Sequence, residues 1–175
     1  MNRVTRRKFL GGATLAAAAT GEVLVFVDAD TAVPAETIRA ALAALERGAV
    51  GGGARTRFDG APLLARVLVG TFVFLLRRLR VAAGCFLFCR RADFEAVGGF
   101  DEGLFASEEV ALSFALRRRG RFVALREGVI TSSRKIRTHS PGELLGALLL
   151  PLRRGRRAFR EREGLDVWYG PRRVD

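Results

Sequence analysis

This 175-residue chain has few residues of several types, and each scarcity excludes a class of protein. Cysteine occurs only at positions 85 and 89, too few for a disulfide-rich secreted domain or a four-ligand structural zinc site. We expect Cys85 and Cys89 to be buried thiols in a reducing compartment. The best apolar run, Val67 to Leu76, is bounded by arginines and is shorter than the roughly 18 residues that cross a bilayer.

Positive charge, by contrast, is abundant. The net charge is +12, and arginine supplies nearly all of it because Lys8 and Lys135 are the only lysines. Such a surface favours anionic partners such as nucleotides or acidic lipid headgroups, although solvated surface faces also explain it. No basic run alternates with stacking aromatic residues, so we expect no nucleic-acid partner.

The most informative segment is an apolar run that leads directly into two carboxylates. The residues from Val23 to Val27 are apolar and mostly β-branched or aromatic, which predicts a fully buried strand of a parallel or mixed sheet. Asp28 and Asp30 follow it. Ligands of open α/β sheets bind outside the carboxyl ends of strands. Two carboxylates there predict a site for a hard divalent cation with its diphosphate.

The remaining pattern predicts an α/β domain in which strands alternate with helices. We expect further strands, the last one single or paired, over 50–58, 84–89 and 121–130. Helices are expected after Pro34 as far as Gly48, over 61–80, over 91–97, from the cap Ser107 to 119, and after a capping box at 140–143.

The two ends of the chain are expected to lie outside the domain of residues 21–150. Arg6-Arg7 and the small apolar residues after it resemble a twin-arginine export signal. Residues 8–19 equally predict an alanine-rich helix leading into the first strand, so residues 1–20 have two interpretations. Residues 151–175 are expected to form a basic tail.

A second acidic motif opens the helix that follows Ser107. Glu108 and Glu109 occupy its first turn, where the helix N-terminus is expected to stabilise ionised carboxylates. An ionised carboxylate on a rigid helix can accept a proton from an attacking hydroxyl. Acidic residues are also common in a first helical turn for capping alone.

A basic segment, expected to be a loop, covers 131–140. Its cations suit a diphosphate, and it contains the only histidine of the chain, a candidate metal ligand. A lone histidine beside a helix cap is more often an ordinary polar residue. The candidates are Arg134, Lys135, Arg137 and His139.

Taken in order, these segments resemble the family-2 glycosyltransferases of GT-A fold over about residues 12–150. The motifs that carry the resemblance are Asp28-Ala29-Asp30, the segment from Gly84 to Glu102, the helix from Ser107 to Gly120 and the basic segment. The resemblance implies a partial GT-A, Rossmann-like mixed sheet flanked by helices.

The resemblance also implies an activity and its residues. The activity is inverting, metal-dependent transfer from a nucleotide-sugar donor to a hydroxyl of a glycan or lipid-linked acceptor, on the cytoplasmic side. Asp28 and Asp30 match the DxD motif, in which Asp30 would hold Mg²⁺ or Mn²⁺ and Asp28 would lie near the ribose or the metal. Glu109 matches the catalytic base. Glu108 is the alternative base, because the family usually has Glu-Asp where this chain has Glu-Glu.

Other positions acquire roles through the same resemblance. A loop with the sequence Gly-Gly-Phe-Asp-Glu lines the acceptor side, and basic residues contact the donor diphosphate. The acceptor residues are Gly99, Phe100 and Asp101; the donor residues are Arg134, Lys135 and Arg137; a second metal ligand is His139.

The chain departs from the family before Gly21. Family members begin with a strand and a Pro-x-x-Asn/Asp-Glu-like turn, followed by a strand with a nucleoside-binding acidic residue, and nothing similar precedes Gly21. We therefore expect an N-terminally truncated domain with an unpaired strand and weak or no donor binding, active or inactive as a fragment. The alternatives are a non-catalytic basic protein of the membrane surface, peripheral to the inner membrane through helix 61–80, and a twin-arginine export substrate.

Overall fold

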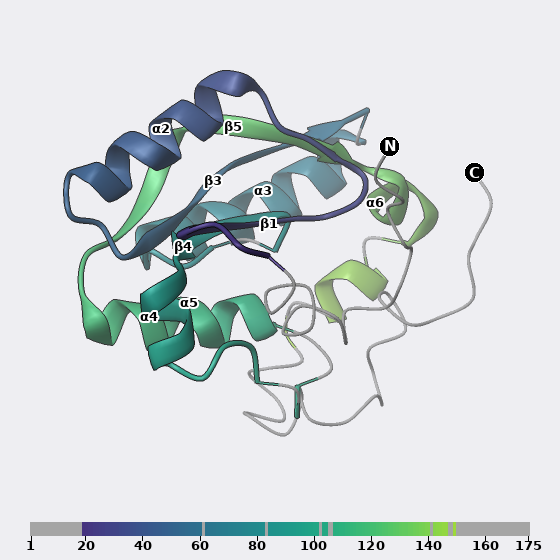
Figure 1. Cartoon of the computed structure of the whole chain (residues 1–175). Helices are drawn as coiled ribbons and strands as arrows, with labels where there is room; N and C mark the ends of the chain where they lie inside the picture. Colours follow the sequence, from purple (N-terminus) through teal and green to yellow (C-terminus); the bar gives the residue numbers. More distant parts are fainter. Residues whose placement is uncertain are drawn as a thin grey trace.

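The computed structural model describes residues 19–149 except 61, 83, 102, 105, 106, 141, 147 and 148. The predicted N-terminal segment and basic tail therefore lie largely outside the described residues. The elements (Figure 1) are, in order, β1 (Val23–Val27), β2 (Thr31–Ala32), α2 (Ala35–Glu46), β3 (Gly51–Asp59), α3 (Leu63–Arg78), β4 (Phe86–Arg90), α4 (Arg91–Ala96), α5 (Glu108–Arg119), β5 (Phe122–Ser132) and α6 (Arg134–Thr138).

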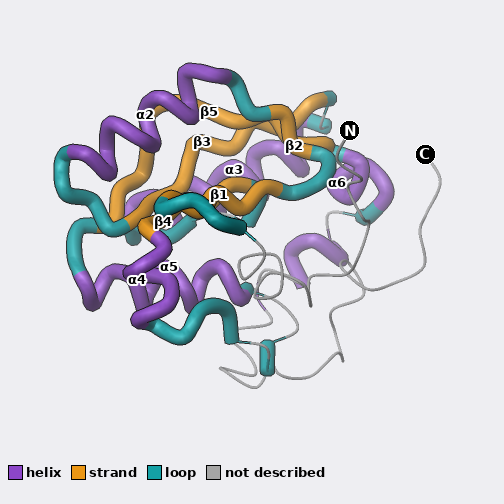
Figure 2. Tube along the Cα trace, viewed as in Figure 1, coloured by secondary structure: helices purple, strands orange, loops and turns teal. Residues whose placement is uncertain are grey.

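The five strands form one mixed sheet in the order β1-β4-β3-β5-β2. Only β3 and β5 run parallel; β1 pairs with β4, β4 with β3, and β2 with β5 in the antiparallel sense. β1 and β2 lie at opposite ends of this order, although only residues 28–30 separate them in the chain. The sheet therefore curls into a nearly closed, barrel-like form (Figure 2). The predicted mixed α/β architecture is confirmed.

Helices cover both faces of the sheet because side chains along each strand alternate in direction. Phe86 and Phe88 of β4 pack with buried residues of α2. Leu87 and Cys89, which alternate with them, pack with buried residues of α4 and α5. In Figure 1, α2 lies above the sheet, and α4 and α5 lie below it. Cys85 and Cys89 are both buried free thiols, as predicted, and burial raises their pKa to about 11 and about 12.

The prediction of a fully buried first strand is wrong. β1 is an edge strand, and within the described part of the chain β4 is its only neighbour. Leu24 is buried, but Val25 and Val27 are 39% and 43% exposed. The apolar run fits an edge strand because one of its faces still packs on the core of α4 and α5.

Two further predictions of local structure are corrected. The basic segment is not all loop, since Arg134–Thr138 forms the short helix α6. Ser107 does precede α5, but its side chain makes no cap hydrogen bond because its backbone is left-handed, with φ of 59°. The capping box is confirmed: Ser140 N–H donates to Glu143 at 2.7 Å, and Glu143 N–H donates to Ser140 Oγ at 3.3 Å.

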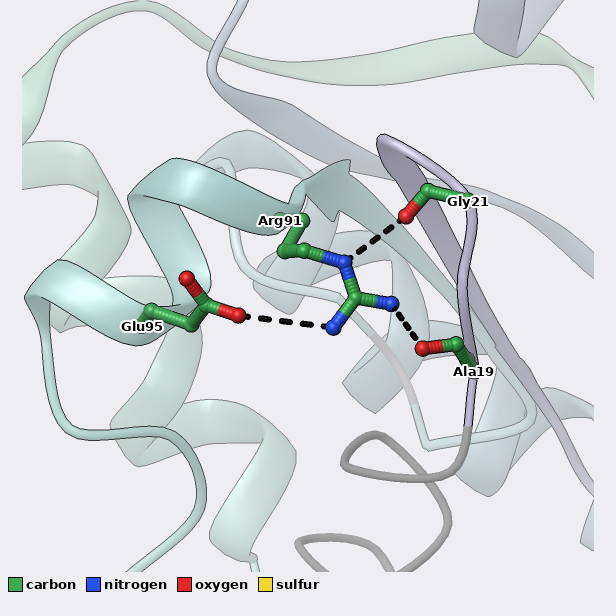
Figure 3. Close-up of polar contacts among 4 residues, drawn as sticks. All are labelled: Ala19, Gly21, Arg91 and Glu95. Carbon is green, nitrogen blue, oxygen red and sulfur yellow. Dashed lines mark hydrogen bonds and ion pairs between the residues drawn. The ribbon is translucent and has the colours of Figure 1, made fainter.

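Arg91, the first residue of α4, fastens the start of β1 to the domain (Figure 3). Its Nε donates to the Gly21 carbonyl at 2.8 Å and its Nη2 to the Ala19 carbonyl at 2.5 Å. Its Nη1 pairs with Glu95 at 3.4 Å. The residues just before β1 are therefore bound to the folded domain.

Candidate active site

The Asp28-Ala29-Asp30 segment is a tight connection between the two edges of the curled sheet. The Asp28 N–H donates to the Cys85 carbonyl at 3.3 Å, and the Asp28 carbonyl accepts from Thr31 N–H at 3.0 Å. The Asp30 carbonyl accepts from Ser132 N–H at 3.3 Å. Backbone hydrogen bonds thus hold both aspartates at the carboxyl end of β1, as predicted, between the start of β4 and the end of β5.

The acidic pair begins α5 and lies against the segment that leads into β4. Glu108 is buried, with 8% of its surface exposed, and Glu109 is partly buried. The Glu109 carboxylate accepts hydrogen bonds from its own backbone N–H and from that of Gly84. A Cβ at Gly84 would lie 3.4 Å from Glu109 Oε1, so glycine leaves room for the carboxylate.

Asp28 connects the two acidic motifs electrostatically. Burial, the charge of Glu109 and the charge of Asp28 together raise the pKa of Glu108 to about 7. Burial and Asp28 also raise the pKa of Glu109 to about 7, although its backbone hydrogen bonds act in the opposite direction. Residues that are far apart in the sequence therefore lie near enough for their charges to interact, and we call Asp28, Glu108 and Glu109 the carboxylate cluster.

These pKa values correct the expectation that the N-terminus of α5 keeps both glutamates ionised. Burial and the neighbouring negative charges outweigh the helix N-terminus, because a charged carboxylate loses hydration in the protein interior. A carboxyl group that titrates near neutral pH can both accept and release a proton. Such perturbed groups gather at functional sites more often than elsewhere.

Two residues that the sequence did not single out position the cluster. Gly84 binds the Glu109 carboxylate through its N–H. Ser113 Oγ donates to the Glu109 carbonyl at 2.7 Å and accepts from Ala82 N–H at 3.1 Å, so it ties the first turn of α5 to the same segment. The positive φ of Gly84, 22°, makes glycine favourable there, but no local motif marks Ser113.

The basic segment begins beside Asp30. Ser132, which donates to the Asp30 carbonyl, also accepts from Arg134 N–H at 3.2 Å through its Oγ. The Arg134 side chain is exposed at the start of α6. Arg137 Nη1 donates to Ser133 Oγ at 3.1 Å. The side chain of Lys135 lies outside the described residues; among the predicted basic residues whose side chains are described, Arg134 and Arg137 lie at this end of the sheet.

The described residues contain no group of three or more His, Cys, Asp or Glu side chains arranged to share a metal ion. His139 lies beyond α6, with its Nδ1 3.3 Å from Thr138 Oγ1. Mg²⁺ is commonly bound by one or two carboxylates and by phosphate oxygens of the substrate. Asp28 and Asp30 fit that mode of binding, and the pairing of Asp30 with His139 stays a prediction.

The predicted acceptor loop is fixed to the core by its aromatic residue. The Phe100 ring packs 4.9 Å from that of Phe26 and 5.6 Å from that of Phe94. Gly99 has a φ of 73°, and Asp101 Oδ1 accepts from Gly103 N–H at 3.0 Å. The Phe100 ring therefore anchors the loop against β1, while the predicted acceptor role of the loop is not tested.

Comparison of the chain with protein-family models, with curated proteins and with solved structures gave no match. The functional argument therefore rests on the sequence motifs and on the geometry of the carboxylate cluster.

Proposed function

We propose that the chain carries the diphosphate and base end of an inverting glycosyl-transfer site, in a partial GT-A-like domain. The observation that carries the proposal is that both acidic motifs lie against one segment: the Asp28 N–H donates to the Cys85 carbonyl at 3.3 Å, and a Cβ at Gly84 would lie 3.4 Å from Glu109 Oε1. It joins the two acidic motifs on which the resemblance to family-2 glycosyltransferases depends.

Glu109 is the proposed general base. Its carboxylate accepts the proton of an acceptor hydroxyl while that oxygen forms a bond to the anomeric carbon of the donor sugar. The bond from this carbon to the diphosphate breaks, and its electron pair leaves with the diphosphate. A pKa of about 7 places Glu109 in the range where a base is effective at neutral pH. Glu108, whose pKa is also about 7, is the alternative base.

The negative charge of the leaving diphosphate needs nearby cations. Asp28 and Asp30 would hold Mg²⁺ or Mn²⁺, which supplies electrostatic stabilisation of the diphosphate oxygens when bound. Arg134 and Arg137, at the same end of the sheet, would add positive charge beside the diphosphate. Asp30 thus has a role distinct from that of the carboxylate cluster.

The first prediction concerns metal-dependent binding of the leaving group. Calorimetric titration with UDP, GDP and dTDP should give binding heat that requires Mn²⁺, because a divalent cation held by Asp28 and Asp30 would supply the positive charge that a diphosphate needs. Asp30→Asn should abolish the Mn²⁺-dependent heat. Glu46→Gln, at an exposed position that ends α2, is the matched control and should behave as wild type.

Binding that needs neither Mn²⁺ nor Asp30 would contradict the proposed diphosphate site itself.

A further inference from the structure

Helix α3 presents an apolar stripe to solvent. Its residues recur at helical spacing on one side of the helix and continue into the turn that follows it. Each of six large apolar side chains on α3 and this turn is more than half exposed: Leu63, Leu64, Val67, Phe74, Leu75 and Leu79. Large apolar patches on the surface of a folded domain commonly mark an interaction site.

The fold does not use this stripe to hold α3 in place. Val69, outside the stripe, packs with Ile136 of α6 and Phe58 of β3 in a small cluster. The end of the helix is held through the backbone, because Arg117 Nη1 donates to the Leu79 carbonyl at 2.5 Å. In Figure 2, α3 lies behind β1 and β3, on the side of the sheet away from α2.

Arginines that make no ion pair within the described residues surround the stripe. Arg66, Arg78 and Arg80 are exposed, and α3 contains no acidic residue. Arg77 Nη1 is buried without a hydrogen-bond partner in the described part of the chain. Burial and the nearby charge of Arg55 lower the pKa of Arg77, and its guanidinium has no counter-ion among the described residues.

The exposed apolar stripe and the arginines around it together indicate which partner covers α3. A second copy would bring the same arginines together, and the segments 1–18 and 150–175 also carry net positive charge. Like charges oppose both arrangements. An anionic bilayer interface offers both an apolar layer for the stripe and phosphates for the arginines.

We infer that α3 docks the domain on the surface of an anionic membrane, with the stripe in the interfacial layer and the arginines among lipid headgroups. None of the described helices is long and apolar enough to cross a bilayer, so α3 lies along the surface. Long arginine side chains can extend from an inserted helix to the headgroups. This inference does not depend on the proposed sugar transfer.

Co-sedimentation of the full chain with vesicles tests the inference. Wild type should bind vesicles of phosphatidylcholine with phosphatidylglycerol, and binding to phosphatidylcholine alone should be weaker by roughly tenfold or more. The double variant Val67→Glu with Phe74→Glu should lose binding by a similar factor. Leu42→Glu, on the exposed side of α2, is the matched control and should bind as wild type. Arg66→Gln with Arg78→Gln should remove the preference for anionic vesicles.

Three results would overturn the inference. The first is equal binding of the α3 double variant and wild type while both keep the same thermal unfolding. The second is equal binding to neutral and anionic vesicles. The third is a wild-type dimer in analytical ultracentrifugation without lipid that Val67→Glu with Phe74→Glu dissociates, because a second copy would then cover the stripe.

Discussion

The substitution Glu109→Gln is expected to reduce sugar transfer by roughly a hundredfold or more and to stabilise the fold above pH 7. The loss of transfer follows because an amide cannot accept the acceptor proton. The gain in stability follows because the charge that burial and Asp28 disfavour is removed. The transfer assay is Mn²⁺-dependent release of nucleoside diphosphate from UDP-, GDP- and dTDP-sugars at millimolar concentration.

The sign of the pH dependence follows from the raised pKa. The folded state holds the Glu109 proton up to about pH 7, whereas the unfolded chain releases it near the ordinary value of 4.5. The folded state therefore binds more protons between these pH values, and wild-type stability falls as pH rises through them. The penalty is complete above pH 7, where Glu109→Gln should raise the free energy of unfolding by about 1–3 kcal/mol.

Urea unfolding at about pH 5 and about pH 8.5 measures this effect. The two proteins should differ little at the lower pH, and Glu46→Gln should match wild type at both. A Glu109→Gln variant that is less stable than wild type at the higher pH would contradict the buried-charge explanation. If Glu109→Gln transfers sugar as fast as wild type, Glu108 becomes the candidate base. If Glu108→Gln also transfers at the wild-type rate, neither glutamate is the base.

Gly52→Ala is expected to be the most destabilising small substitution in the sheet. A Cβ at Gly52 would lie 2.4 Å from the Val123 carbonyl oxygen and 2.7 Å from Phe88 Cζ. The β3–β5 ladder fixes the first of these atoms, so relief requires the strands to separate. We expect a loss of about 3 kcal/mol in the free energy of unfolding.

Gly70→Ala is the matched control, because a Cβ at Gly70 in α3 meets nothing within 4 Å. Alanine there should stabilise the protein by about 0.5–1 kcal/mol, since it favours the helix over the unfolded chain. Chemical denaturation of both variants measures the contrast. A Gly52→Ala variant within about 1 kcal/mol of wild type would show that β3 and β5 do not approach as closely as described.

Short sequence patterns correctly predicted those strands and helix ends that depend on neighbouring residues in the chain. The residues from Val23 to Val27 form a strand, as expected for mostly β-branched or aromatic residues, and α5 ends at Gly120 as expected. Three consecutive glycines at the start of β3 leave room for the close backbone approach that is found there. The same patterns placed Asp28 and Asp30 at the carboxyl end of a strand.

Features that depend on distant residues were not predictable in this way. The position of β1 at the sheet edge depends on which strand pairs beside it, and an apolar sequence does not specify that. The raised pKa of Glu109 depends first on burial and then on Asp28, neither of which a helix-capping pattern contains. Ser113 holds the first turn of α5 through Ala82, and only the folded chain brings these two residues together.

The central claim is that Asp28, Glu108 and Glu109 form one coupled site. An NMR titration that follows the side-chain carboxyl carbons of both glutamates, in wild type and in Asp28→Asn, tests this claim most directly. Both carboxyl groups should titrate at about pH 7 in wild type, and both pKa values should fall in Asp28→Asn, because that charge raises each of them. Titration of both groups near 4.5 in wild type, with no response to Asp28→Asn, would contradict the claim.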